Sequence, residues 1–269
     1  MQKNLPSAIT SYDWLKTLAV LLMVVDHIGY YFFPDDNWWR VVGRLCVPLW
    51  FFLIGYARSR DLDKRVLIGG LILTLADFAA GHYFIPVNIL FSMLIIRMII
   101  DPLMDFCSRG VEALAFTSLF ILSFGLLSMM LFEYGFLGVM LAMLGWLMRH
   151  KDEPEAMGEI TPAMMWVFAV FTYMTFVVLE GISFGFTPLQ NMALAIGTLG
   201  SFWLILTFHP QTFPELTEKI GSVASLVRLG GRRTLEIYVG HLILFKILGV
   251  LIDPERFHPF TLKWFWVQS

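Results

Sequence analysis

The chain has 269 residues, of which 58% are hydrophobic and 15% are charged, and its formal net charge is −2. Soluble domains carry about 25% charged residues, so the composition argues against a soluble enzyme, and the weak net charge argues against a nucleic-acid partner. With 25 Phe and nine Trp, the chain is predicted to be an all-α integral membrane protein with a single domain over residues 1–269. Cys46 and Cys107 fall in apolar stretches without metal-site spacing, so no metal is expected.

The first apolar run, Asp13 to Pro34, is long enough for a bilayer crossing, which needs roughly 20 residues. It lacks a small-residue cleavage site and is therefore expected to remain as the first span. Further spans are expected at about 41–57, 66–80, 86–100, 113–132, 134–148, 162–179, 189–208 and 234–252, which makes a bundle of about nine transmembrane helices. Pro48 should kink the second span, because proline cannot donate to the carbonyl of residue 44.

Residues 209–233 are too polar to span a membrane. Within them Ile220, Val223, Ala224 and Val227 recur at helical spacing, and a Gly-Gly pair at 230–231 is typical of a helix end. This segment is predicted to form an interfacial helix on the cytoplasmic membrane surface.

The charges of the connections predict the orientation of the bundle. Basic residues follow every second span, at 58–65, Arg109, Arg149 with Lys151, and 228–233, whereas the other connections carry Asp35, Asp36, Glu133 and Glu180. By the positive-inside rule the N-terminus is cytoplasmic.

The first span carries an Asp26-His27 pair in its apolar run. An ionisable residue inside a membrane costs at least ~2.5 kcal/mol and usually faces a polar partner or a cavity. Lys16 lies eleven residues before His27, which places both within about 20° of one helix face and about 16 Å apart along the axis. Asp26 points away and needs a partner from another span, for which Arg44 is the first candidate. The alternative is that the span ends early and leaves the pair at the interface.

The last span contains Tyr238 and His241, three residues apart and therefore on one face. His241 lies eight residues beyond Arg233, or about 12 Å into the membrane. This depth is close to that of His27. Two histidines at one depth indicate a shared site, although a hydrogen-bonded structural role for His241 is equally compatible with the sequence.

Several of these motifs together resemble the TraX family, known for acetylating F-type pilin. They are Lys16-x-Leu-Ala with Met23-x-x-Asp26-His27-Ile, Gly43-Arg44-x-x-x-Pro48-Leu, Asn88-Ile-Leu-Phe91, Tyr134-Gly135-x-x-Gly138-Val and Ile237-Tyr238-x-x-His241-Leu. Lys16-x10-His27 is also similar to the Arg-x10-His signature of the broader acyltransferase-3 enzymes, with Lys in place of Arg.

The resemblance implies acyl transfer from a cytoplasmic acyl-CoA, such as acetyl-CoA, to an amine or hydroxyl in a bacterial inner membrane. The acceptor, which could be a pilin N-terminus, a sugar or a small amine, stays open. The implied catalytic set is His27, Asp26, Arg44, His241 and Tyr238, with His27 as general base or transient acyl carrier. The implied cofactor-binding set is Lys16, Arg58, Arg65, Asn88, Arg232 and Arg233. Expected partners are membrane lipids, acyl-CoA, the acceptor and, as an option, a second copy of the chain.

Two other functions remain open at this stage. A proton-coupled transporter could use Asp26, His27, Asp77, Glu236 and His241 as a proton relay. A non-catalytic assembly subunit would not need histidines within the membrane.

Overall fold

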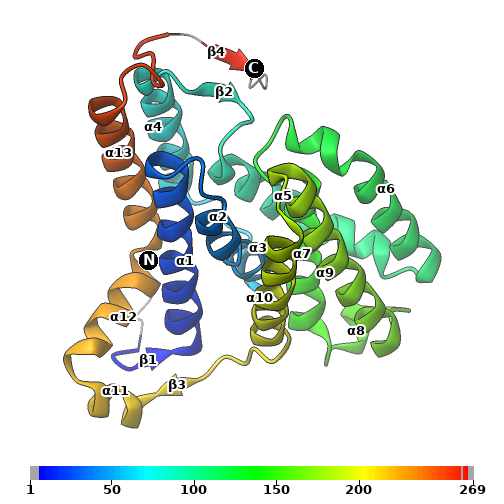
Figure 1. The fold of residues 1–269 in the computed structure, drawn as a ribbon. Helices are drawn as coiled ribbons and strands as arrows, with labels where there is room; N and C mark the ends of the chain where they lie inside the picture. The colour runs from blue at the N-terminus through cyan, green and yellow to red at the C-terminus, as the bar shows by residue number, and fades with distance from the viewer. Residues whose placement is uncertain (1–5, 262, 266–269) are drawn as a thin grey trace.

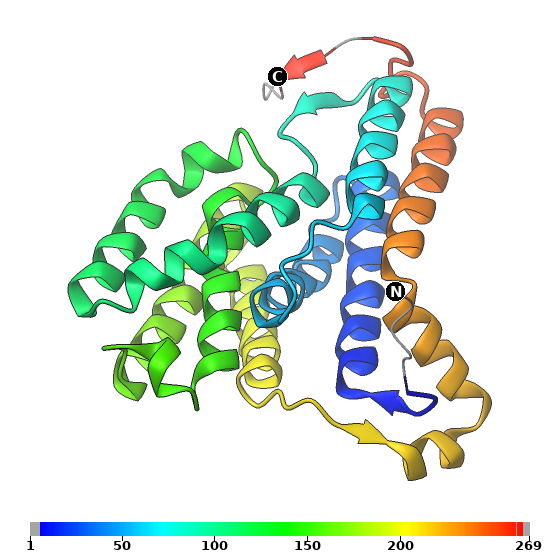
Figure 2. The ribbon, with the colours of Figure 1, turned by 180° about the vertical axis from the view of Figure 1, so that it is seen from behind.

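The computed structural model describes residues 6–261 and 263–265 and is dominated by helices (Figures 1 and 2). The longer helices are α1 (Ser11–Phe32), α3 (Cys46–Tyr56), α4 (Lys64–Ala80), α5 (Ile89–Cys107), α6 (Val111–Met129), α7 (Gly135–His150), α9 (Pro162–Phe184), α10 (Pro188–Leu206), α12 (Ser222–Arg232) and α13 (Thr234–Ile252). The short helices are α2 (Trp38–Gly43), α8 (Pro154–Met157) and α11 (Pro214–Ile220). Strands β1 (Ile9–Thr10) and β3 (Thr212–Phe213) pair antiparallel, and β2 (Tyr83–Ile85) and β4 (Lys263–Phe265) pair parallel.

Among the described residues, five segments are long and apolar enough to cross a membrane. They are Ser11–Phe32, Trp38–Tyr56, Pro162–Phe184, Pro188–Leu206 and Thr234–Ile252. Large apolar side chains such as Leu21, which is 61% exposed, lie on the outside of these helices, as lipid contact requires. The chain is therefore an all-α membrane protein, and the count of about nine spans stays a prediction.

Helix ends follow from local chemistry. The side chain of Thr10 accepts a hydrogen bond from Asp13 N, and that of Asp13 accepts one from Thr10 N, which makes a capping box at the start of α1. Thr187 and Gln190 form the same motif at α10. Gly81 ends α4 with φ of 73°, a left-handed conformation that glycine adopts without strain.

The predicted second span is broken into two helices. α2 ends at Gly43 and α3 begins at Cys46, so the helix is interrupted at residues 44–45, shortly before Pro48. Because Pro48 cannot donate to the carbonyl of Arg44, that carbonyl accepts from Val47 N at 3.1 Å instead. The predicted kink is confirmed as an interruption between α2 and α3, at which Arg44 and Leu45 keep helical backbone angles.

Two predicted boundaries were wrong. The fourth span was expected to stop near Ile100, but α5 continues through Pro102 to Cys107. The seventh was expected to stop at Leu179, but α9 runs to Phe184, so Glu180 belongs to the helix and is only 1% exposed. An isolated proline or acid within an apolar run does not end a helix when the neighbouring helices satisfy it.

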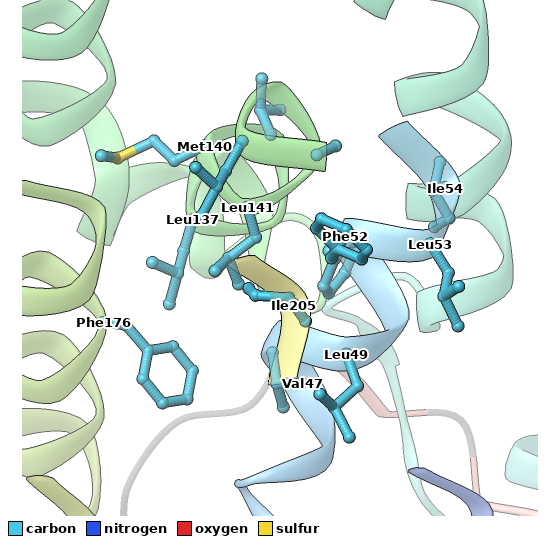
Figure 3. Close-up of a cluster of buried hydrophobic side chains, with 14 of the residues drawn as sticks. Val47, Leu49, Phe52, Leu53, Ile54, Leu137, Met140, Leu141, Phe176 and Ile205 are labelled. Atoms are coloured by element: carbon cyan, nitrogen blue, oxygen red, sulfur yellow. The ribbon is translucent and has the colours of Figure 1, made fainter. Parts of the chain in front are cut away.

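The tightest packing joins α3 to α7 at the centre of the bundle. A Cβ atom at Gly55 would lie 1.8 Å from Ala142 O, and one at Gly145 would lie 2.1 Å from Phe52 O, so only glycine allows these backbones to approach so closely. Around this contact, buried side chains from α3, α7, α9 and α10 form the apolar core (Figure 3).

Helix α1 packs against α2 and α3 on one side and against α12 and α13 on the other (Figures 1 and 2). α13 in turn packs against α4, α4 against α5, and α5 against α3. These contacts form a closed circuit of α1, α13, α4, α5 and α3. Polar side chains on their inner faces are thereby directed toward one another.

The segment 209–233 forms β3, α11 and α12, with a break at Gly221 rather than the single helix expected. Ile9 of β1 is fully buried against Ala224 and Val227 of α12. α12 lies along the first half of α1, where Gly231 approaches Asp13. The predicted helix exists, but its buried face contacts protein, and Val223, expected on that face, is 49% exposed.

The segment after α13 folds back over the far end of α1. Arg256 donates to the carbonyls of Tyr30 and Tyr31, which are among the last of that helix. Phe257 is buried beside Tyr31 and His82, with its ring 5.2 Å from the His82 ring. β4 then pairs with β2, which follows His82 directly.

Burial of His82 predicts acid sensitivity of this end of the molecule. Desolvation, followed by the charges of Lys246, Arg256 and Lys263, lowers the pKa of His82 to about 3. In the unfolded chain His82 takes up a proton near pH 6.5. The folded protein therefore keeps its full free energy of unfolding above pH 6.5 and loses part of it as the pH drops toward 3. We expect the midpoint of thermal unfolding to decrease over this window, and His82→Phe to flatten the decrease. Equal slopes for both proteins would contradict this assignment.

Candidate functional site

The two histidines predicted at one depth are in contact. Nδ1 of His27 on α1 lies 2.8 Å from Nε2 of His241 on α13, although the residues are 214 positions apart. Their rings are 5.0 Å apart and tilted by 33°. Nδ1 of His241 in turn lies 2.6 Å from the carbonyl oxygen of Ile237, one turn earlier on the same helix. This polar contact joins the first and last predicted spans.

Lys16 and His27 occupy one face of α1, as their spacing predicts. This face is opposite to the exposed apolar face that carries Trp14, Leu18 and Leu21. Both Lys16 and His27 are nevertheless partly exposed. The exposed part of each side chain therefore faces the inside of the helix circuit.

Tyr238 joins the histidine pair. Its ring lies 6.0 Å from the His27 ring and 5.9 Å from the His241 ring, and the residue is 9% exposed. Its hydroxyl makes no hydrogen bond to the residues that the structure describes. A hydroxyl that has no protein partner is a candidate donor for a substrate oxygen.

Asp26 turns away from His27 into a network of four buried charges. Its carboxylate lies 2.8 Å from Arg40 and 3.6 Å from Arg44. Arg44 also lies 3.4 Å from Glu180 of α9 and donates to the hydroxyl of Tyr134. The predicted pairing of Asp26 with Arg44 is present. However, Arg40 is the closer cation to Asp26.

This network includes residues that the sequence reasoning missed. Arg40 lies one helical turn before Arg44, and that i, i+4 spacing was a usable signal. Glu180 was assigned to a connection, and only the longer α9 reveals it as an intramembrane acid. Arg44 lies within 4.0 Å of two acids and donates to Tyr134, so its surroundings favour a structural role over a place in the implied catalytic set.

A second buried ion pair lies beyond the histidines. Nζ of Lys246 on α13 is 2.5 Å from Asp77 on α4 and 2.8 Å from the hydroxyl of Tyr31 on α1. Lys246 was also missed, although a lysine within the apolar run of the last span was a visible signal. Asp77 therefore has a cation partner. Glu236, expected inside the bundle, has a half-exposed side chain that pairs with Arg233.

Most residues of the predicted cofactor-binding set already have partners. Arg232 binds Asp13 at 3.0 Å, Arg233 binds Glu236 at 3.1 Å, and Arg65 binds Asp63 at 2.8 Å. Asn88 caps α5 and donates to Gly70 O and the Thr74 hydroxyl on α4. Within the described residues, Lys16 and Arg58 have no acidic group within 4.0 Å.

Arg58 lines a cleft of about 390 Å³ at the end of the bundle where α1 begins. Arg60 and Arg149 share this cleft, and Arg60 is bound to Asp101 at 2.9 Å. Arg149 lies 5.5 Å over the Tyr56 ring and, among the described residues, has no acid within 4.0 Å. Arg58 and Arg149 are therefore the cleft's unpaired cations.

Comparison with known proteins finds relatives that match parts of this chain. An uncharacterised protein of Rickettsia prowazekii (strain Madrid E) is 39% identical over 85 residues, which is 31% of this chain and 34% of that protein. Protein TraX of Escherichia coli is 31% identical over 94 residues, or 33% of this chain and 38% of its own. A probable fimbrial assembly protein FimC (serogroup H1) of Dichelobacter nodosus is 33% identical over 133 residues, which is 42% of this chain and 53% of that protein.

The chain thus spans roughly a third to a half of the length of these relatives. No solved structure matches. The family described as TraX protein matches over residues 11–210, a range that includes α1 through α10 and holds Lys16, His27 and Arg44. Because this match covers most of the chain, the protein belongs to the TraX family.

Proposed function

We propose that this protein is a membrane-embedded acyltransferase that moves an acetyl group from cytoplasmic acetyl-CoA to an amine or hydroxyl. The observation that carries the proposal is the contact of His27 with His241 on the inner face of α1. An imidazole next to a second imidazole inside a membrane bundle is suited to general base catalysis near neutral pH. Membership of the TraX family supports the same reaction class. The Lys16–His27 spacing also resembles the Arg-x10-His signature of acyltransferase-3 enzymes.

In this reaction the acceptor nitrogen or oxygen attacks the thioester carbonyl while His27 takes its proton. The tetrahedral intermediate then collapses, the carbon–sulfur bond breaks, and His27 returns the proton to the leaving thiolate. The developing oxyanion needs a donor, and we assign this role to the hydroxyl of Tyr238. Arg44 is held by other residues and instead supports α1 through Asp26.

The negative charge of acetyl-CoA suggests where this acetyl donor binds. Acetyl-CoA phosphates require cations on the cytoplasmic side, and Lys16 and Arg58 are the members of the predicted set that remain unpaired within the described residues. Lys16 lies about 16 Å along α1 from His27, which is half of a ~30 Å hydrocarbon core. The phosphates would then bind at the cytoplasmic end, while the thioester reaches the histidines.

The proposed setting is a bacterial inner membrane with the N-terminus in the cytoplasm and about nine spans. The acceptor is suggested only by the names of relatives, of which one is a probable fimbrial assembly protein. A fimbrial or pilin subunit is therefore the first acceptor to test, ahead of sugars and small amines.

A proton-coupled transporter fits the observed contacts less well. A relay needs groups that can both accept and release a proton. Nδ1 of His241 ends on the carbonyl of Ile237, which cannot be protonated at ordinary pH, and Glu236 pairs with Arg233 instead. Asp77 is neutralised by Lys246. A proton relay of the transporter type would thus be interrupted at each of these residues.

Ligand binding tests the proposal. Acetyl-CoA at 100 times its Kd should stabilise the purified protein by about 2.7 kcal/mol, read as an upward shift of thermal unfolding in detergent. Charge reversal at Arg58 should weaken this shift, whereas reversal at the already paired Arg65 should leave it unchanged. Absence of any shift at millimolar acetyl-CoA, with no acetylated product in cells that express the protein, would reject the acyltransferase.

A further inference from the structure

The hydrogen bonds around the histidine pair have a direction. Nδ1 of His241 lies 2.6 Å from the carbonyl oxygen of Ile237, and a carbonyl oxygen can only accept. Nδ1 of His241 therefore carries the proton. A neutral imidazole has one N–H, so Nε2 of His241 presents a lone pair toward His27.

The same reasoning assigns the proton on His27. Its Nδ1 lies 2.8 Å from Nε2 of His241, and because that nitrogen is an acceptor, Nδ1 of His27 must be the donor. Nε2 of His27 then carries the lone pair. This nitrogen has no hydrogen-bond partner among the described residues, and the partly exposed side chain lies on the inner face that it shares with Lys16.

We infer that His241 is a positioning residue, which fixes the tautomer and ring orientation of His27 so that Nε2 of His27 is the nitrogen that removes the proton from the acceptor. This inference rests on the proposed acyl transfer and adds the identity of the reacting atom. In metal sites, partners that hold the second nitrogen of a ligating histidine typically account for about 10- to 100-fold effects, and we expect the same scale for His27.

The proton balance is complete within the pair. When Nε2 of His27 takes the acceptor proton, the ring becomes an imidazolium, and its Nδ1–H bond to His241 becomes charge-assisted and stronger. The proton on Nδ1 of His241 cannot move to the Ile237 carbonyl, so the charge stays on the two rings. The acceptor proton then passes from Nε2 of His27 to the thiolate that departs when the carbon–sulfur bond breaks.

Two substitutions separate positioning from packing. His241→Gln can place its side-chain oxygen near the position of Nε2 and accept from His27, whereas His241→Leu fills space without accepting. We expect His241→Leu to lower kcat by about tenfold or more while the Kd for acetyl-CoA stays within twofold. His241→Gln should recover most of this loss.

The decisive measurement is the nitrogen-15 spectrum of histidine-labelled protein in lipid bilayers, with His27 assigned by its loss in His27→Gln. Wild type and His241→Gln should show His27 protonated at Nδ1 and unprotonated at Nε2, and His241→Leu should show a mixture of tautomers. His150→Gln is the matched spectroscopic control, because His150 makes the same bond to the carbonyl four residues earlier, at 2.9 Å, and should leave the His27 signals unchanged.

A wild-type His27 protonated at Nε2, or an unchanged tautomer in His241→Leu, would overturn the inference. The spectra do not depend on turnover. If they agree with the assignment and acetyl-CoA is not consumed, the tautomer stands and the proposed acyl transfer is rejected.

Discussion

We expect His27→Ala to lower the rate of the proposed acetyl transfer by about 100-fold or more, the loss that follows when a general base is removed. The same substitution should leave the Kd for acetyl-CoA within a few-fold, because the donor phosphates are proposed to bind about 16 Å away at the level of Lys16. Single-turnover rates and equilibrium binding, measured on one preparation, separate the two effects.

Lys16→Ala is the complementary variant. It should weaken acetyl-CoA binding while the rate at saturating donor falls much less than in His27→Ala. A His27→Ala protein that turns over acetyl-CoA near the normal rate would exclude His27 as the base. In that case the histidine contact would be structural.

We expect Arg44→Met to destabilise the protein by about 3–5 kcal/mol, the range found when one partner of a buried ion pair is removed. Its removal leaves Glu180 as a buried carboxylate that, among the described residues, has no other cation within 4.0 Å. Asp26 is affected less, because Arg40 remains 2.8 Å away. The midpoint of unfolding in detergent provides the measurement.

A double-mutant cycle tests which acid depends on Arg44. Arg44→Met combined with Glu180→Gln should recover much of the lost stability, since no unpaired carboxylate remains. Arg44→Met combined with Asp26→Asn should recover less, because Arg40 is then left without its acid. A larger coupling energy for Asp26 than for Glu180 would contradict the observed arrangement.

The sequence allowed prediction of features that depend on one segment at a time. Pro48 indicated the break in the second span because the lost hydrogen bond is local. The shared face of Lys16 and His27 followed from helical periodicity alone. The common depth of His27 and His241 followed from counting residues along each helix from the cytoplasmic membrane surface, and the structure brings the two rings together.

Partners from distant segments were not predictable in the same way. Arg232 was expected to bind a phosphate, but it binds Asp13, which lies 219 positions away. Nothing in the residues around Arg232 indicates that contact, which depends on the close approach of Gly231 to α1. Glu180 was missed because its helix was predicted to stop at Leu179. Lys246 was a visible charge in an apolar run, which shows that a partner exists without identifying it.

The contact between His27 and His241 has a consequence for biosynthesis. At about 5–20 residues per second, the ribosome needs roughly 10–40 s to synthesise the 214 positions that separate the two histidines. During this time α1 sits in the membrane with an unpaired imidazole, and β1 waits for β3, its partner near residue 212. Helix α1 is thus completed by a helix that is synthesised much later, so nascent chains stalled before α13 should be inactive and prone to capture by membrane chaperones or proteases.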